Sequence, residues 1–282
     1  METIRRDLQK HIAGKKITQI LAAPKKNIIS GSLNAFKKKL LRNRIENLER
    51  RGKLLYGHLR IGGDYLLIHL KMTGQLVYRH NKQVISGGHP QDFSSDELPN
   101  KYSHVVFTFA DKSHLFFNDQ RQFGYMKIAS PKELDKILSA YGIEPLTSGF
   151  TLPAFRKIMA NKKASVKAVL LNQKYIAGIG NIYADEICFA ARVAPEKQAD
   201  KLTDEEIKNL YKASASVIKK AISKRGTTFR DYRDSAGQAG NFVKYLKVYG
   251  RAGKKCQRCG YAFLKKAKIT GRGTVFCPTC QK

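Results

Sequence analysis

Four of the five cysteines stand in two C-x2-C pairs near the C-terminus, Cys256 with Cys259 and Cys277 with Cys280. This spacing is typical of a site that places four thiolates around one tetrahedral Zn²⁺. Two disulfides are the alternative, and the lack of an export signal disfavours them because disulfides persist in oxidising compartments. Four protein ligands leave no open coordination position, so we expect one structural zinc ion. Cys188 lies alone in an apolar stretch and is expected in the core.

The segment Gly178-Ile179-Gly180-Asn181, here called the glycine turn, separates two predicted helices at 165–171 and 181–191. Glycines permit backbone angles that a side chain forbids, and they let a phosphate approach closely. Asn181 stands at the start of the second helix, where N–H groups and the helix dipole favour an anion. The segment is a candidate phosphate clamp. The alternative is a corner between helices in which Asn181 caps the second helix and binds nothing.

Further candidates stand beside turns in the first half of the chain. Lys53 stands just before a predicted strand. It is either a solvated surface charge or an amine that takes part in chemistry. At the end of the next strand, Met72 is either in the core or an apolar tip that points outward, and His69 is either a core residue with its hydrogen bonds satisfied or a ligand. Arg121 and Phe123 are two apart on an extended loop and project the same way, so they could enter a duplex, Phe123 as a wedge between bases. The alternative is a strand-end arginine beside a core phenylalanine.

The charge of the chain indicates a polyanionic partner. Its 53 Lys and Arg residues against 22 Asp and Glu residues give a formal net charge of +31 over 282 residues. Such a surface favours nucleic acid, through phosphate neutralisation and counterion release. An anionic membrane is the competing partner, but we find no long apolar run and no signal peptide, so we expect a cytoplasmic protein without a membrane partner. The hydrophobic fraction of 42% is enough for real cores.

The N-terminal half is predicted to be mainly β. A helix is expected at 1–12, and short strands with tight turns then indicate a sandwich or a barrel. The expected strands are 17–23, 54–61, 65–72, 104–110 and 114–118. Residues 36–45 are ambiguous, and the polar segment 80–101 is expected to be a long loop.

The C-terminal half is predicted to be helical, after a boundary at 142–145. A capping box, Thr203-x-x-Glu206, opens the last helix. The expected helices are 131–141, 151–159, 165–171, 181–191 and 202–224. Strands at 263–269 and 274–276 are expected to form a zinc-anchored hairpin with Arg272 at the tip of its turn.

Seven motifs follow one another along the chain: H-L-K-M-T-G, D-Q-R-Q-F-G, G-I-E-P-L, G-I-G-N-I-Y-A-D-E, R-G-T-T-F-R-D-Y, V-Y-G-R-A-G, and the cysteine pairs with G-R-G-T-V-F-C-P-T-C. Together they resemble the formamidopyrimidine-DNA glycosylase family, the bacterial base-excision repair enzymes for oxidised purines. The resemblance covers essentially the whole chain. It implies an α+β fold with an N-terminal β-sandwich lobe and flanking helices over 1–128, a linker over 129–145, a helix–two-turns–helix domain over 146–235 and a zinc finger over 236–282.

The resemblance also implies roles for individual residues. Lys53 matches the lysine assigned to β-elimination and lesion contacts, and Arg272 matches a phosphate-binding arginine credited with the later elimination step. The residues that fill the void left by a flipped nucleotide are Met72, Arg121 and Phe123. The remaining matches to DNA-binding positions are His69, Lys163, Asn181, Tyr249 and Arg230, the last in a loop that closes over the extruded base. The implied protein is a monomer in the bacterial nucleoid that binds double-stranded DNA, in the cleft between the lobes, at oxidised bases or abasic sites.

The N-terminus departs from the family pattern. Mature members begin P-E-L-P-E-V-E-T, with the proline as nucleophile and the adjacent glutamate as acid and base, whereas this chain begins Met1-Glu2-Thr3. Met1 matches the valine and Glu2 the third glutamate, so neither catalytic residue has a counterpart. Smaller departures are Gln122, where a basic residue is common, and Tyr102, where a histidine often stands.

Two classes of function therefore stay open. A gene start placed at the valine codon explains this N-terminus and is favoured, because Lys53, Arg272 and the void-filling residues are all present. The alternative is a non-catalytic damaged-DNA-binding protein. An enzyme for pyrimidine lesions, such as endonuclease VIII, is a weaker third hypothesis. The polypeptide as printed is expected to bind DNA without releasing 8-oxoguanine, with weak abasic-site cleavage at most.

Overall fold

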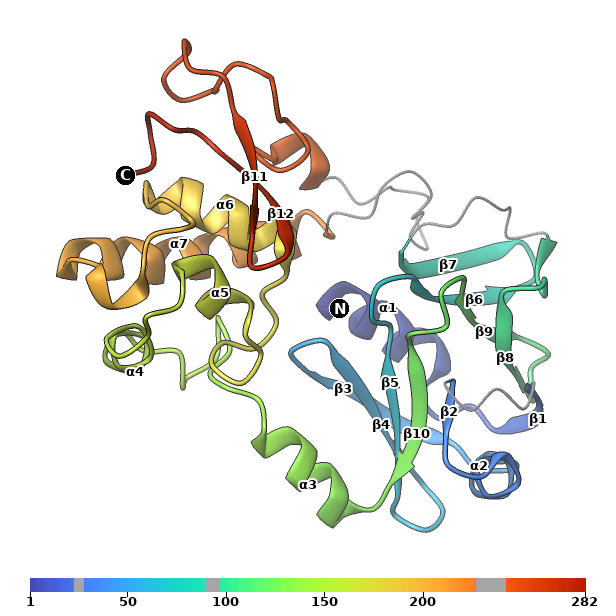
Figure 1. The fold of residues 1–282 in the computed structure, drawn as a ribbon. Coiled ribbons are helices and arrows are strands. Elements are labelled where there is room, and N and C mark those ends of the chain that lie inside the picture. Colours follow the sequence, from blue (N-terminus) through green and yellow to red (C-terminus); the bar gives the residue numbers. More distant parts are fainter. Residues whose placement is uncertain (23–27, 90–96, 227–241) are drawn as a thin grey trace. The chain divides into compact units, whose positions relative to one another are not determined.

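Figure 1 shows the fold of the computed structural model, which describes residues 1–22, 28–89, 97–226 and 242–282. The chain divides into two compact units. The first comprises Met1–Leu138 together with Arg225–Val243, and the second comprises Ser139–Lys224 together with Lys244–Lys282. Each unit has its own buried hydrophobic core.

The first unit is a β-sandwich, as predicted. One sheet has the strand order β1 (Ile17–Ala22), β8 (Ser103–Phe109), β9 (His114–Asp119), β6 (Gly74–His80), β7 (Gln83–Gly88). The other sheet has the strand order β2 (Ile29–Ser30), β10 (Tyr125–Ala129), β5 (Tyr65–His69), β4 (Leu54–Leu59), β3 (Ile45–Arg51). The β2–β10 pair is parallel and the other pairs are antiparallel.

The two sheets pack face to face because each strand turns apolar side chains toward one side. Leu55 and Leu66 of one sheet lie in the same buried cluster as Phe107, Leu115 and Phe117 of the other. This shared core fixes the ends of the strands, and the candidate residues of this unit lie at those ends.

Two helices flank the sandwich. The predicted N-terminal helix is α1 (Glu2–Ile12), which buries the stripe of Ile4, Leu8 and Ile12. The ambiguous segment contains α2 (Leu33–Leu40), which begins earlier than the apolar pattern indicated. Its start is set by Ser32, whose side chain accepts a hydrogen bond from the Ala35 N–H at 3.4 Å.

The prediction of one long loop at 80–101 was wrong in part, because β7 runs through it. Gly87 and Gly88 are typical of loops, but here they permit close packing. A Cβ atom at Gly87 would lie 2.5 Å from the Ile4 side chain of α1. The glycine thus lets the helix approach the strand, and a single sequence gives no sign of such a contact.

The second unit is helical, and the chain enters it after α3 (Pro131–Ser139). Its helices are α4 (Leu152–Met159), α5 (Val166–Leu171), α6 (Asn181–Ala191) and α7 (Asp204–Ser223), with short 3-10 helices at Ala199–Lys201 and Phe242–Tyr245. Side chains of Thr151, Ser165 and Thr203 accept hydrogen bonds at the starts of α4, α5 and α7. The predicted capping box is present, since the N–H of Thr203 also donates to Glu206 at 2.8 Å.

The C-terminal hairpin consists of β11 (Lys265–Ile269) and β12 (Arg272–Phe276). Its turn is the pair Thr270 and Gly271, which have φ values of 50° and 74°. Arg272 therefore begins β12, opposite Ile269, rather than forming the tip of the turn. Among the described residues, no helix combines the length and apolarity needed to cross a membrane.

Candidate functional site

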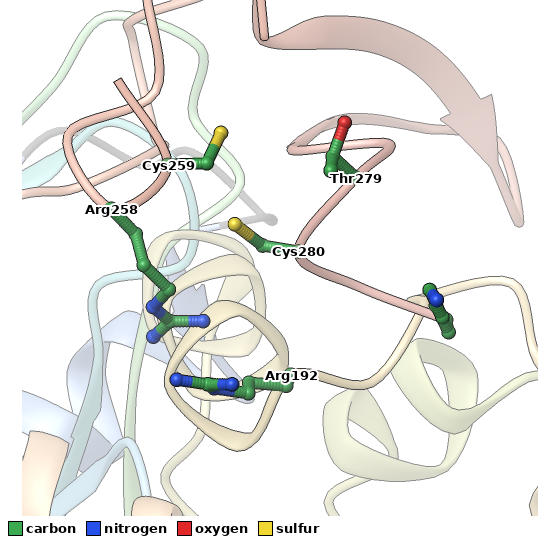
Figure 2. A pocket seen from close by; sticks show the side chains of 6 residues that line it. Arg192, Arg258, Cys259, Thr279 and Cys280 are labelled. Atoms are coloured by element: carbon green, nitrogen blue, oxygen red, sulfur yellow. The ribbon is translucent and has the colours of Figure 1, made fainter. Parts of the chain in front are cut away.

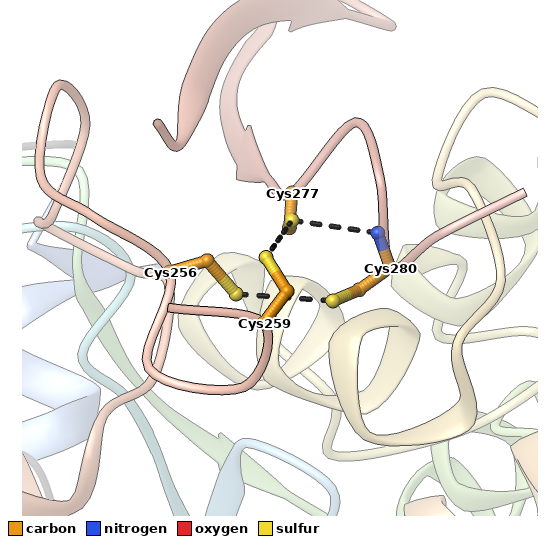
Figure 3. A group of neighbouring side chains, drawn as sticks. All are labelled: Cys256, Cys259, Cys277 and Cys280. Carbon is orange, nitrogen blue, oxygen red and sulfur yellow. Dashed lines mark hydrogen bonds between the residues drawn. The ribbon is translucent and has the colours of Figure 1, made fainter. Parts of the chain in front are cut away.

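The four cysteines of the C-terminal segment come together as their spacing predicts (Figure 3). Their Sγ atoms all lie within 4.8 Å of one another, and the Cys256–Cys280 and Cys259–Cys277 pairs are 3.9 Å apart. A tetrahedral zinc with Zn–S bonds of about 2.3 Å requires sulfur atoms about 3.8 Å apart. A disulfide requires about 2.05 Å. The site therefore fits a metal ion and does not fit two disulfides.

Backbone N–H groups donate to the sulfur atoms, and they favour the thiolate form of Cys259, whereas burial raises the pKa values of Cys277 and Cys280. The N–H of Arg258 donates to the Cys256 sulfur, and the N–H of Cys280 donates to the Cys277 sulfur, each at 3.4 Å. The N–H of Ala262, with a weaker contribution from that of Tyr261, lowers the pKa of Cys259 to about 7. A zinc ion held by four such ligands ties the loops of the finger together and takes no part in chemistry.

A basic pocket of about 450 Å³ lies beside the thiols (Figure 2). It is lined by Arg192, Arg258 and Lys282, with Thr279 and two of the cysteines, Cys259 and Cys280. The Arg258 guanidinium lies 4.0 Å from the Phe189 ring centre and donates to the carbonyl of Phe189 at 2.8 Å. Four thiolates and one Zn²⁺ carry a net charge of about −2, which the two guanidinium groups offset. The pocket therefore belongs to the metal centre.

The glycine turn is held by one side chain that the sequence did not single out. The amide of Gln173 accepts from the Gly178 N–H at 2.8 Å and donates to the Ile179 carbonyl at 2.9 Å. Gly178 has a φ of 91°, so the turn needs a glycine there. These bonds fix the direction in which the chain enters α6.

Asn181 lies one position inside α6, and the alternative that made it the capping residue is wrong. Gly180 is the N-cap and supplies no side chain to the first turn of α6. The Asn181 amide instead donates to the Gly273 carbonyl of the finger at 3.0 Å. Its Oδ1 atom is buried, and no hydrogen-bond partner lies among the described residues. Lys163, the other predicted phosphate ligand of this unit, is exposed ahead of α5.

A buried ion pair holds the strand that begins with Arg272. Lys167 and Asp185 are 0% and 1% exposed, and their charged atoms are 2.6 Å apart. Lys167 also donates to Thr274 at 2.7 Å, and Asp185 accepts from the Val275 N–H at 3.0 Å. The pair joins α5, α6 and β12, so it sets the position of Arg272. The sequence does not single out Lys167, and only the folded structure shows that it is buried.

Tyr249 is placed by another buried carboxylate of α6. Glu186 is 4% exposed and accepts from three consecutive N–H groups, those of Lys247, Val248 and Tyr249, at 2.9 to 3.1 Å. One helix thus carries Asn181 and holds both Tyr249 and the finger. Arg230 lies outside the described residues.

In the first unit, Met72, Arg121 and Phe123 form one surface group, here called the void-filling cluster. Met72 and Phe123 are 52% and 50% exposed, so the alternative that placed them in the core is wrong. The Arg121 guanidinium lies 4.6 Å from the Phe123 ring centre, and its Nη1 is 3.8 Å from the Met72 sulfur. Gln122 has a φ of 55°, so Arg121 and Phe123 meet across a tight turn rather than along an extended loop.

Lys53 and His69 are close neighbours at the strand ends of the same unit. Lys53 follows Gly52 in the β3–β4 turn, and its neighbour Leu54 pairs with His69. Burial, and then the charges of Lys71 and Lys53, lower the pKa of His69 to about 4. The ring is therefore neutral at pH 7. Its Nδ1 atom accepts from the Lys71 N–H at 3.0 Å, which leaves Nε2–H as a donor.

Models of known families match most of the chain. The formamidopyrimidine-DNA glycosylase N-terminal domain matches residues 1–126, and the H2TH domain of the same enzymes matches residues 141–233. The zinc finger found in FPG and IleRS matches residues 253–282. The formamidopyrimidine-DNA glycosylase of Pelotomaculum thermopropionicum is 41% identical over 100% of this chain and 97% of its own length. That of Listeria monocytogenes is 38% identical over 100% and 98%.

The chain belongs to the formamidopyrimidine-DNA glycosylase family. Membership makes it a DNA glycosylase of base-excision repair and confirms the predicted family, fold and zinc finger. Solved structures agree. A Lactococcus lactis Fpg variant in complex with Fapy-dG-containing DNA has a TM-score of 0.86 at 32% identity, over 100% of this chain and 97% of that chain. The Lactococcus lactis Fpg complex with abasic-site DNA has a TM-score of 0.85 at the same identity and coverage.

Proposed function

We propose that this chain is a bifunctional glycosylase that recognises oxidised purines in double-stranded DNA and also nicks abasic sites. The void-filling cluster is the observation that carries the proposal. Met72 and Phe123 expose about half of their surface, and Arg121 lies against both. Exposed apolar tips around one guanidinium suit insertion into a base stack, where Phe123 replaces stacking and Arg121 replaces hydrogen bonds.

Phosphate contacts come from both units in this proposal. In the second unit, Asn181 offers an amide, Tyr249 a hydroxyl, and Lys163 and Arg272 charged groups. The Lys167–Asp185 ion pair and the Glu186 carboxylate hold the scaffold that carries Asn181, Arg272 and Tyr249. In the first unit, the neutral His69 offers Nε2–H. Arg230 completes the set by family resemblance. The net charge of +31 supports a duplex as the partner, since it can neutralise many phosphates.

Lys53 is proposed as the amine of the abasic-site reaction. Its side chain lies near the neutral His69, whose pKa its charge helps to lower. The charged amine of Lys53 must first lose its proton to water. It can then add to the aldehyde of an abasic site, and the adduct takes up one proton and loses water to form an iminium. The iminium acidifies the neighbouring C2′–H, and loss of that proton expels the 3′ phosphate. Arg272 is proposed to serve the second elimination by binding the phosphate that leaves.

Base release by the printed sequence alone is not expected. Glu2 accepts from Arg5, Arg6 and Arg50 at 2.7 to 2.9 Å. Burial opposes ionisation, but these three partners lower the pKa of Glu2 to about 2, so it has no proton to donate at pH 7. Met1 is the N-cap of α1 and packs partly against the core. We propose that neither residue replaces the family's proline and glutamate.

The test is borohydride trapping on an 8-oxoguanine duplex and on an abasic-site duplex. Two proteins are compared: the printed polypeptide, and one with P-E-L-P-E-V in place of Met1 and the initiator methionine removed. We expect the extended protein to release 8-oxoguanine and to be trapped strongly on both duplexes. We expect the printed polypeptide to be trapped weakly at most, and only on the abasic-site duplex. Strong trapping on 8-oxoguanine by the printed polypeptide would show that another amine is the nucleophile. Tight lesion binding without trapping by the extended protein would favour a non-catalytic binder.

The same preparations test the assembly and the substrate. We propose a monomer, which light scattering of the zinc-loaded protein checks. We also propose that oxidised purines are preferred, so a thymine glycol duplex should be a poorer substrate for the extended protein than 8-oxoguanine. A reversal of that order would place the chain with the pyrimidine-lesion enzymes.

A further inference from the structure

Beneath the void-filling cluster lies a fully buried carboxylate, that of Asp119 at the end of β9. One oxygen, Oδ1, accepts from the Thr73 hydroxyl and from the Arg121 N–H, the latter at 3.2 Å. The other, Oδ2, accepts from the Gly124 N–H at 2.6 Å. A carboxylate with no exposure is expensive to bury unless such donors satisfy it.

The three donors come from two separate segments. Thr73 belongs to the turn between β5 and β6 that carries Met72, and Gly124 ends the segment that carries Arg121 and Phe123. The Arg121 N–H also donates to the Thr73 hydroxyl at 3.2 Å, which closes the set. One side chain thus joins the two loops on which the whole void-filling cluster stands.

The backbone of Asp119 is held by two hydrogen bonds, and its side chain packs closely against Gly124. Its N–H donates to the Tyr102 carbonyl at 3.0 Å, and its carbonyl accepts from the His104 ring at 2.7 Å. Around Gly124 there is no room for a side chain, because a Cβ atom there would lie 3.0 Å from Asp119 Oδ2 and 3.0 Å from the His69 carbonyl. A side chain at position 124 would therefore push the 120–124 segment away from the carboxylate.

We propose that Asp119 is the positioning residue of the void-filling cluster: its carboxylate holds Met72, Arg121 and Phe123 in the one arrangement that enters a damaged duplex. The inference rests on the proposed function. Asp119 touches no DNA in this account. Asp119 acts through the two loops that carry the cluster. Without its carboxylate, the side chains of Met72, Arg121 and Phe123 move independently, and each binding event has to order them at a cost in conformational entropy.

The experiment measures binding of the zinc-loaded protein to a duplex with a tetrahydrofuran abasic analogue and to the intact duplex, by fluorescence anisotropy. The variant is Asp119→Asn, which keeps the shape but presents an N–H₂ group to one of the donors. The matched control is Asp111→Asn, at the other end of β9, where a carboxylate caps a turn and pairs with Lys15. We expect the preference for the analogue to fall at least tenfold in Asp119→Asn and to be unchanged in Asp111→Asn.

A double-mutant cycle with Phe123→Ala separates positioning from general damage. If Asp119 acts through the cluster, the double variant loses no more preference than the worse single variant, because the two residues act as a unit. Losses that multiply would overturn the proposal. If Asp119→Asn does not fold, two variants of Thr73 replace it in the experiment. Thr73→Val removes one of the three donors to the carboxylate, and Thr73→Ser keeps the hydroxyl and so serves as the conservative variant. A retained preference in Thr73→Val, or no recovery in Thr73→Ser, would likewise overturn it.

The result for the unaltered chain separates the two proposals. If the unaltered chain binds the abasic analogue and the intact duplex equally, the proposed function fails and the inference with it. If it prefers the analogue and Asp119→Asn keeps that preference, only the positioning role of Asp119 is refuted.

Discussion

Phe123→Ala is the perturbation that tests most directly how the chain recognises damage. Because Phe123 is 50% exposed, its removal opens no large cavity in the free protein. Its contact with the Arg121 guanidinium, 4.6 Å from the ring centre, is a surface cation–π pair. Such a pair contributes about 0.5–1 kcal/mol. We therefore expect a small change in the free energy of unfolding, of the size usual for surface substitutions.

The effect on lesion binding is expected to be much larger. An aromatic side chain buries about 200 Å² when fully covered, and the exposed half of Phe123 leaves roughly 100 Å² to bury on insertion. At about 25 cal/mol per Å² this is ~2.5 kcal/mol. That free energy corresponds to a loss of about 70-fold in affinity for a duplex from which a nucleotide is displaced. Intact duplex, which the ring does not enter, should lose little.

The assay compares dissociation constants for a tetrahydrofuran duplex and an intact duplex at one salt concentration. Ile61→Ala is the matched control, since Ile61 is 62% exposed on the β4–β5 turn of the same unit. It should leave both constants unchanged. Equal losses on both duplexes by Phe123→Ala, or a fall in melting temperature of the size that a core phenylalanine gives, would refute the reasoning.

The remaining predictions concern the metal, two DNA contacts and the pH dependence of stability. Metal analysis should find one zinc ion per chain. Removal of the zinc by a chelator, or the substitution Cys256→Ser, should unfold the finger and abolish tight DNA binding. A protein without zinc that has a Cys256–Cys259 disulfide would contradict this prediction. Because His69 has a pKa of about 4, its ring is neutral at pH 7. His69→Ala should therefore weaken DNA binding without changing the slope of log K against log salt. Arg272→Ala removes a positive charge and should reduce the steepness of that slope by about 0.9. The pKa of His69 in the folded protein lies below the usual histidine value of about 6.5. The stability that the neutral ring contributes is therefore complete above about pH 6.5 and is lost as the pH falls toward 4. Measuring the free energy of unfolding across this pH range checks the prediction.

Features that depend on neighbours in the sequence were predicted well. The hairpin of β4 and β5 follows from a Gly-Gly-Asp turn between apolar strands, and the start of α7 follows from the spacing of Thr203 and Glu206. In such cases the bonding partners are only a few residues apart, so the local pattern contains most of the physics.

Predictions failed where a residue's environment comes from distant segments. Gly87 indicated a loop, but it is a strand residue that Ile4 packs against. Asn181 was a plausible cap for its own helix, but its amide donates to Gly273 instead. In both cases the deciding partner is more than eighty residues away, and local propensity gives no information about it.

By itself, the sequence determined the zinc ligands, the basic surface and the family, because ligand spacing, net charge and motif order are properties of the chain before it folds. Only the tertiary structure decided which charged residues are buried and what they hold. Lys167 and Asp119 are ordinary polar residues in the sequence, yet both are fully buried, one under β12 and one under the void-filling cluster. Burying a charge requires several donors or acceptors to converge in space, and only the folded chain brings them together.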